Sequence, residues 1–147
     1  MTDHLRHREF IGYQIYAAHR VLMRSLDMTL APFGLTASQW NALNQLHEYG
    51  DMTQKELSEH LNKEPATVVR LLDRLVKHGL VKRTSHPEDR RANIVGITPA
   101  AVDLLNTVEP YAAARADRIA EGISDEDLST FFRVLDTVRQ NAERSME

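Results

Sequence analysis

The feature that most constrains the fold is a helix-start signal that occurs three times along the chain. In each copy a hydroxyl residue stands three positions before an acid or amide, and apolar residues flank the pair. A hydroxyl at the N-cap accepts a hydrogen bond from a backbone N–H that the first helical turn leaves unpaired. The sequence therefore predicts three helix starts, at the pairs Thr36 and Gln39, Thr53 and Glu56, and Ser124 and Asp127.

Proline and glycine mark two further helices and a change of periodicity between them. Pro65 suits the first position of a helix that ends at Gly79, since proline is tolerated at N1 and glycine is favoured at C′. Thr98 followed by Pro99 predicts the start of another helix, which runs towards Gly122. Between these helices, two short segments with β-branched residues, 80–84 and 93–97, flank the polar residues 85–91. This pattern predicts a hairpin with a long charged tip.

The order of these elements is that of a winged helix-turn-helix. Residues 62–64 form the turn, residues 65–78 the recognition helix and residues 80–97 the wing. On a helical wheel the recognition helix separates a basic face from an aliphatic one. The basic face carries Thr67, Arg70, Arg74 and Lys77, and the aliphatic face carries Val68, Leu71, Leu72, Leu75 and Val76. We expect the aliphatic face to pack on the domain and the basic face to meet the major groove of DNA.

The charge of the chain is unevenly distributed. The 147 residues have a net charge of −3, which taken alone argues mildly against nucleic acid as a partner. Residues 63–91, however, contain eight basic and four acidic residues, a net charge of +4, against ten and 17 elsewhere, a net charge of −7. Residues 63–91, which include the predicted recognition helix and most of the wing, are therefore basic, and the rest of the chain is acidic.

Both ends of the chain are apolar in a way that predicts a second subunit. From residue 10 to 31 apolar side chains cover most of the helix circumference, and at the C-terminus they recur as a heptad seam. A partner subunit would cover them by two-fold symmetry; alternatively both ends pack on their own domain. We predict dimerisation through Ile11, Ile15, Leu22, Leu128, Phe131, Leu135 and Val138.

Three segments follow from these patterns: an N-terminal dimerisation helix over residues 1–34, a winged lobe over 35–98, and C-terminal dimerisation helices over 99–147. The expected fold class is mainly α (α+β), a winged helix-turn-helix with long terminal helices.

Several function classes find no support in the residues. The chain has no cysteine, which excludes disulfides, thiolate metal sites and thiol chemistry. Its histidines are dispersed, so we expect neither a metal nor a cofactor. Phosphate loops and catalytic serine or zinc motifs are absent, which argues against an enzyme. No signal peptide or membrane span is evident, so we expect a cytoplasmic protein without membrane contact. A winged-helix protein-interaction module without DNA affinity stays open as an alternative.

The stretch from Pro65 to Thr98 closely resembles the multiple-antibiotic-resistance repressor (MarR) family. The likeness lies in Arg-Leu-Leu-Asp-Arg-Leu at 70–75, His-Gly-Leu-Val at 78–81, Asp-Arg-Arg at 89–91 and Ile-Thr at 97–98. It extends to the long apolar first helix and the two C-terminal helices. The chain departs from the family in two ways: Ala100 and Ala101 stand where a glycine is frequent, and Ile97 stands where leucine is usual.

The resemblance implies a homodimeric regulator that binds a palindromic operator in double-stranded DNA. By position, Pro65, Ala66, Thr67, Arg70 and Arg74 match the groove-facing segment of the family, and Arg90 and Arg91 match the wing tip. From the residues themselves we add three groups. Thr53 and Gln54 lie at a helix N-terminus suited to phosphate. Lys82 and Arg83 stand on the wing stem, and Asp89 is placed to orient a neighbouring arginine.

The resemblance also implies repression of nearby genes that a small, often aromatic or phenolic, effector relieves. Candidate effector-binding residues share aromatic, apolar or cationic character: Tyr13, Tyr16, Arg20, Met23, Trp40 and Tyr111. The alternative interpretation, which we favour, places Trp40 and Met23 in the core and the tyrosines at the dimer seam.

Overall fold

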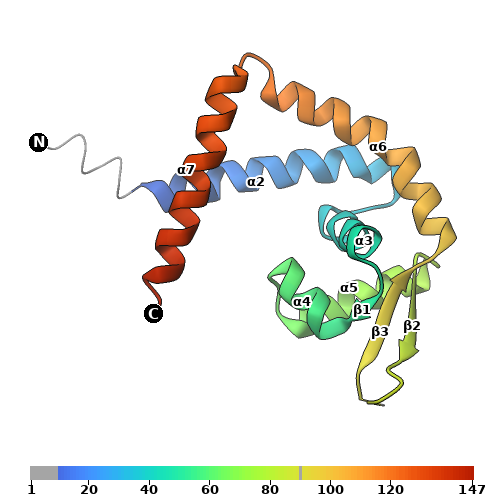
Figure 1. Ribbon diagram of the computed structural model, residues 1–147. Helices are drawn as coiled ribbons and strands as arrows, with labels where there is room; N and C mark the ends of the chain where they lie inside the picture. Colours follow the sequence, from blue (N-terminus) through green and yellow to red (C-terminus); the bar gives the residue numbers. More distant parts are fainter. Residues whose placement is uncertain (1–9, 90) are drawn as a thin grey trace, which may run out of the picture. The chain divides into compact units, whose positions relative to one another are not determined.

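The computed structural model describes residues 10–89 and 91–147, which form helices and one small sheet (Figure 1). In chain order the elements are α2 (Ile11–Leu30), the 3-10 helix η1 (Ala31–Phe33), α3 (Ala37–Tyr49), β1 (Met52–Thr53), α4 (Gln54–Leu61), α5 (Pro65–Lys77), β2 (Val81–Ser85), β3 (Asn93–Ile97), α6 (Pro99–Ala120) and α7 (Asp125–Arg144). The predicted mainly helical winged helix-turn-helix is confirmed.

The N-terminal caps that the sequence predicts are present. Thr36 and Thr53 each form the full reciprocal capping box, with Gln39 and Glu56 respectively. At Ser124 the hydroxyl accepts from the backbone N–H of Asp127 at 3.1 Å, but the reciprocal bond, in which the Asp127 carboxylate would accept from the backbone N–H of Ser124, is not formed. The helix starts are therefore confirmed, while the third box is only half formed.

The end of α5 is also the predicted one. Gly79 has φ +71°, a left-handed conformation that glycine adopts without strain. Its N–H donates to the carbonyl of Val76 at 3.0 Å, and the N–H of Leu80 donates to the carbonyl of Leu75 at 2.9 Å. These two bonds are the Schellman pattern, which turns the chain directly from α5 into the wing.

The wing belongs to a three-stranded antiparallel sheet in the order β1-β3-β2. The strand β2 begins and ends one residue later than predicted, with Val81 opposite Ile97 and Ser85 opposite Asn93. The strand β1 was not predicted. It consists only of Met52 and Thr53, which pair with Val95 and Ile94 of β3, and a two-residue strand leaves no periodicity in the sequence.

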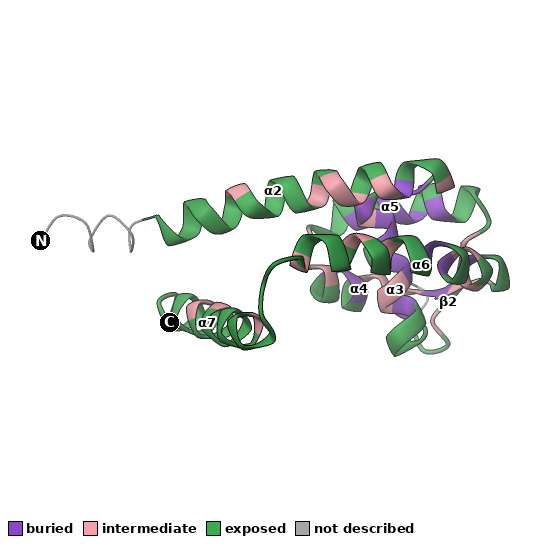
Figure 2. Cartoon of the chain, turned by 90° about the horizontal axis from the view of Figure 1, so that it is seen from above, coloured by how far each residue is buried: buried purple, intermediate pink, exposed green. Residues whose placement is uncertain are grey.

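Most of the core lies inside the winged lobe, by which we mean residues 35–98 (Figure 2). Leu43 of α3, Leu57 of α4, Leu72 and Leu75 of α5, and Val95 of β3 are all fully buried. Leu30 at the end of α2 and Val108 of α6 join the same cluster. The recognition helix is thus held by an apolar core on its inner face.

The chain divides into two compact units, the first ending at Ala113 and the second comprising Ala114–Glu147. The helix α6 continues through Pro110, and none of the described residues of α7 is buried. On α7, hydrogen bonds from Arg139 to Asp136 and Glu143 raise the pKa of its guanidinium. The division into residues 1–34, 35–98 and 99–147 stays a prediction. Across residues 10–89 and 91–147, no helix combines the length and apolar character that crossing a bilayer requires.

Candidate nucleic-acid interface

The recognition helix α5 has the two faces that the wheel predicts. Val68, Leu71, Leu72 and Leu75 are buried, whereas the predicted DNA-binding residues Pro65, Ala66, Thr67, Arg70 and Arg74 are exposed. One assignment to the aliphatic face was wrong. Val76 is 38% exposed because it stands at the edge of the apolar stripe, and Val69 is exposed to the same degree.

A groove of about 530 Å³ separates the first turn of α5, the start of α4 and the wing tip. It brings together five of the predicted DNA-binding residues, Thr53, Gln54, Pro65, Asp89 and Arg91. Lys55 and Val69 line it as well; sequence reasoning missed both, although the position of Lys55 in the first turn of α4 was a usable signal.

The N-terminus of α4 is partly occupied by its own cap. The Thr53 hydroxyl accepts from the N–H of Glu56 at 3.1 Å, and the N–H of Thr53 donates to Oε2 of Glu56 at 2.8 Å. The Glu56 carboxylate therefore takes one of the positions at which a phosphate could meet a backbone N–H. A phosphate bound here would rely on the next N–H groups along the first turn.

The two basic residues of the wing stem have different surroundings. Lys82 is exposed, whereas the side chain of Arg83 is only 24% exposed. The Arg83 guanidinium donates to Oε1 of Gln54 (2.9 Å), Oδ1 of Asp73 (2.6 Å) and the Val69 carbonyl (3.2 Å). Sequence reasoning missed these contacts, because the residues involved lie 10 to 29 positions from Arg83.

The wing tip is shaped by Asp89. Its carboxylate accepts from the backbone N–H of Arg91 at 2.9 Å, an Asx turn that holds the chain two residues further on. Asp89 therefore orients the neighbouring arginine through the main chain. The side chain of Arg91 is exposed, and Arg90 lies outside the described residues.

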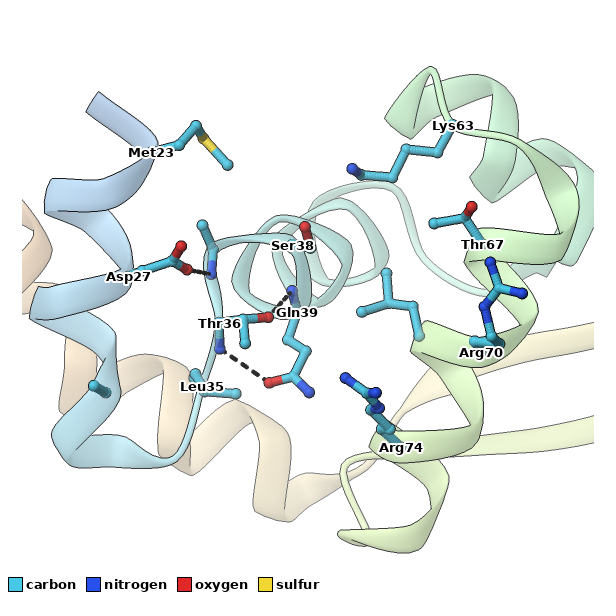
Figure 3. A pocket seen from close by; sticks show the side chains of 13 residues that line it. Met23, Asp27, Leu35, Thr36, Ser38, Gln39, Lys63, Thr67, Arg70 and Arg74 are labelled. Carbon is cyan, nitrogen blue, oxygen red and sulfur yellow. Dashed lines mark hydrogen bonds between the residues drawn. The ribbon is translucent and has the colours of Figure 1, made fainter. Parts of the chain in front are cut away.

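A second cavity, of about 540 Å³, lies on the other flank of α5 (Figure 3). The recognition helix contributes Thr67, Arg70 and Arg74, and the preceding turn contributes Lys63. The opposite wall comes from α2 and the start of α3, where Oδ1 of Asp27 accepts from the N–H of Ala37 at 2.6 Å. The basic side chains of α5 thus border a cavity as well as solvent.

The six candidate effector-binding residues do not line this cavity together. Met23 alone among them lies in its wall. Trp40 is 8% exposed and belongs to the core, while Tyr111 contacts Phe33 with ring centroids 5.1 Å apart. Arg20 lies 5.8 Å from the ring centroid of Tyr16, and Tyr13 is exposed beside Phe10. Trp40 lies in the core as the alternative predicts, whereas Met23 is half-buried in the cavity wall, so its predicted place in the core was wrong.

In the part of the chain that the structure describes, no group of three or more histidine or carboxylate side chains converges on a metal-sized site.

Sequence comparisons agree with this architecture. The MarR family model matches residues 35–92, which cover most of the winged lobe. The HTH-type transcriptional regulator YwoH of Bacillus subtilis (strain 168) is 34% identical over 119 residues, which cover 81% of this chain and 86% of YwoH. The chain belongs to the MarR family.

Solved structures of MarR-family proteins share the fold of this chain. A mutant MarR from E. coli complexed with operator DNA superimposes with a TM-score of 0.82 at 25% identity, covering 88% of this chain and 95% of that one. The transcriptional repressor CouR, bound to a 23-mer DNA duplex, also has a TM-score of 0.82, at 27% identity, with 90% and 94% covered. This MarR-family chain therefore has the fold of regulators whose structures contain DNA.

The dimerisation residues predicted for this MarR-family chain lie on poorly covered helices. Ile11, Ile15 and Leu22 of α2 are 40–41% exposed, and Phe131 of α7 is 54% exposed. Leu128, Leu135 and Val138 are half-buried. The seam itself stays a prediction, because the structure describes a single chain.

Proposed function

We propose that this MarR-family regulator is a homodimer that binds a palindromic operator, represses nearby genes and is released by a small anionic ligand. The observation that carries the proposal is the exposed basic face of α5. Thr67, Arg70 and Arg74 project from a helix whose inner face is anchored by buried Leu71, Leu72 and Leu75. A rigidly held helix with exposed arginines suits the major groove, which admits an α-helix.

The groove between wing and helix supports a second set of contacts. Its Lys55 and Arg91 side chains and the first-turn N–H groups of α4 can neutralise and bind phosphates beside the major groove. Arg91 on the wing tip can enter the adjacent minor groove, whose narrow form has an enhanced negative potential. Lys82 adds an exposed cation on the wing stem.

The salt dependence of binding tests DNA recognition directly. If about six phosphates are neutralised, log K for a duplex falls against log salt with a slope near −5. Arg139→Gln, which removes a charge from α7 outside the proposed surface, is the matched control and leaves the slope unchanged. Absent or salt-insensitive duplex affinity at low ionic strength contradicts the proposal and favours a protein-interaction module.

Exposed apolar side chains on α2 and α7 support the homodimer. A two-fold symmetric dimer presents two winged lobes to DNA. Lobes spaced by one turn, about 34–36 Å, read half-sites whose centres are about ten base pairs apart. Footprinting of the bound duplex measures this spacing, and a single unpaired half-site contradicts the dimeric arrangement.

The cavity beside α5 supports release by an anion. Lys63, Arg70 and Arg74 border it, and two of these cations belong to the proposed DNA-reading face. An aromatic carboxylate bound there would compete with DNA for the same charges. Benzoate titrated into the protein–duplex complex is therefore expected to displace DNA, and more weakly in Lys63→Gln. Sodium chloride at the same ionic strength is the control. If it displaces DNA to the same extent, the effect of benzoate is charge screening and not binding in the cavity.

A further inference from the structure

Arg83, one of the two basic wing-stem residues that the sequence predicts as DNA contacts, is hydrogen-bonded to other parts of the lobe. Arg83 and three acceptors, the side chains of Gln54 and Asp73 and the main-chain carbonyl of Val69, form what we call the Arg83 cluster. Every nitrogen of the guanidinium donates within it. The cluster joins β2 to α5 and to the first residue of α4, three elements of the proposed DNA-binding surface.

Strand geometry explains why Arg83 points inward. Successive side chains of a strand point to opposite faces, so Arg83 shares a face with the buried Val81 and opposes the exposed Lys82. The shared face meets α5, where Asp73 and the Val69 carbonyl stand one helical turn apart. The planar guanidinium, with its donors in a fixed fork, can bind all three acceptors at once.

Charge also argues against a phosphate contact by Arg83. The Asp73 carboxylate is 57% exposed on the recognition helix, where it would repel a phosphate unless a cation neutralised it. Its partner Arg83, at 24% exposure, is the more covered of the two. Turning Arg83 towards DNA would break three hydrogen bonds and leave Asp73 uncompensated.

We infer that Arg83 is a positioning residue and makes no DNA contact: with Asp73 it fixes the wing and the start of α4 against the recognition helix. This inference rests on the proposed DNA binding. It assigns different roles to Arg83 and its neighbour Lys82, although both are basic residues of the same strand. The side chain of Gln54 then binds Arg83, and only its backbone N–H can bind a phosphate.

The deciding variant is Asp73→Asn, because the two roles of Arg83 predict opposite signs. If Arg83 contacts phosphate, removing the carboxylate frees the arginine and removes a repulsion, so the duplex binds more tightly. If Arg83 positions the wing, Asp73→Asn weakens binding about fivefold or more, within the coupling range of residues in one network. Glu64→Gln is the charge-matched control at the exposed start of α5 and leaves binding unchanged or tighter.

Salt slopes separate positioning from contact. Anisotropy titrations use a duplex selected by the wild-type protein from a random-sequence library. Arg83→Gln weakens binding with the wild-type slope, and the Arg83→Gln, Asp73→Asn double variant is no weaker than the single ones. Lys82→Gln, with the same charge change on the same strand, reduces the slope by about 0.9. Circular dichroism confirms that each variant is folded.

Two results overturn the inference: binding by Asp73→Asn that equals or exceeds wild type, or a slope reduced by about 0.9 in Arg83→Gln. If the wild-type protein binds no duplex even at low salt, the proposed function fails and the DNA role of Arg83 fails with it. Hydrogen exchange without DNA then still measures the cluster. Faster exchange of the β2 amides in Asp73→Asn shows that it holds the wing, and unchanged exchange shows that it does not.

Discussion

The winged lobe and the terminal helices of this chain differ in where their apolar side chains lie. In the lobe, Leu43, Leu57 and Leu72 are completely buried and belong to one apolar core. On α7 none of the described residues is buried, and Phe131 and Phe132 are 54% and 62% exposed. The helices α2 and α6 show both situations, because Ile11 and Tyr111 are exposed whereas Leu30 and Val108 are fully buried.

This difference separates two sources of stability. Residues that are buried within one chain stabilise it at any concentration, whereas exposed apolar stripes gain their stabilisation only from a partner. The proposed DNA-binding surface lies on the winged lobe, whose core is buried within a single chain. The lobe is therefore expected to keep its shape in a monomer, and the terminal helices to set how many lobes act together.

The largest expected effect comes from breaking the proposed seam. Leu135→Glu places a charge in the C-terminal heptad and is expected to yield monomers by sedimentation velocity. A single lobe reads one half-site, so operator affinity falls about a thousandfold, towards non-specific binding. Thr130→Glu introduces the same charge at an exposed position of α7 and leaves the dimer intact. A dimeric Leu135→Glu protein places the seam elsewhere.

The core of the lobe gives the next largest effect. Leu72→Ala, at a position with no exposure, is expected to lower the free energy of unfolding by about 3 kcal/mol in a denaturant titration. Phe131→Ala, on the exposed side of α7, serves as the comparison. Its effect is expected to depend on protein concentration, because the side chain gains its cover from a partner. Equal, concentration-independent losses in both variants would remove the distinction between the two regions.

The sequence predicts those features of the lobe whose causes are local. The capping boxes at Thr36 and Thr53 and the Schellman turn at Gly79 each depend on residues within a few positions of one another. Turn and helix boundaries also place the five predicted DNA-binding residues of the groove within their own elements, but the packing of those elements is what brings them together.

Features with distant causes could not be predicted in this way. The strand β1 exists only because Met52 and Thr53 pair with β3, more than 40 positions later. The bonds of Arg83 to Gln54 and Asp73 depend on which face of β2 meets α5. Charge marks Lys82 and Arg83 alike, and only packing distinguishes them. The six effector candidates failed to gather because their shared chemistry carries no information about distance.

Within the lobe, Arg70 tests whether the exposed face of α5 reads sequence. Arg70→Ala is expected to lose about 1–3 kcal/mol of binding free energy and to relax preference at one position of the operator. The measurement compares affinities for the operator and for single-base variants of it. Equal losses on every sequence would assign Arg70 to a phosphate.

The wing tip is expected to contribute less than the recognition helix. Arg91→Ala removes one exposed cation, which reduces the salt slope by about 0.9 and weakens binding about fivefold at physiological salt. The thermal midpoint stays that of the wild type, because the Asp89 carboxylate accepts from the backbone N–H of residue 91, which alanine retains. Unaltered affinity would exclude Arg91 from the interface.

The smallest effects compare the same local device in the two regions. Thr36→Ala and Ser124→Ala each remove a hydroxyl that accepts from the N–H three residues on, at 3.2 and 3.1 Å, for a local cost of about 0.5–1 kcal/mol. In the lobe that cost enters the free energy of unfolding at every protein concentration. At the start of α7 it is expected to act through the dimer, so Ser124→Ala lowers the thermal midpoint most in dilute solution. The midpoints of both variants, measured over a hundredfold range of concentration, test this, and parallel curves would show that α7 is stabilised by its own chain.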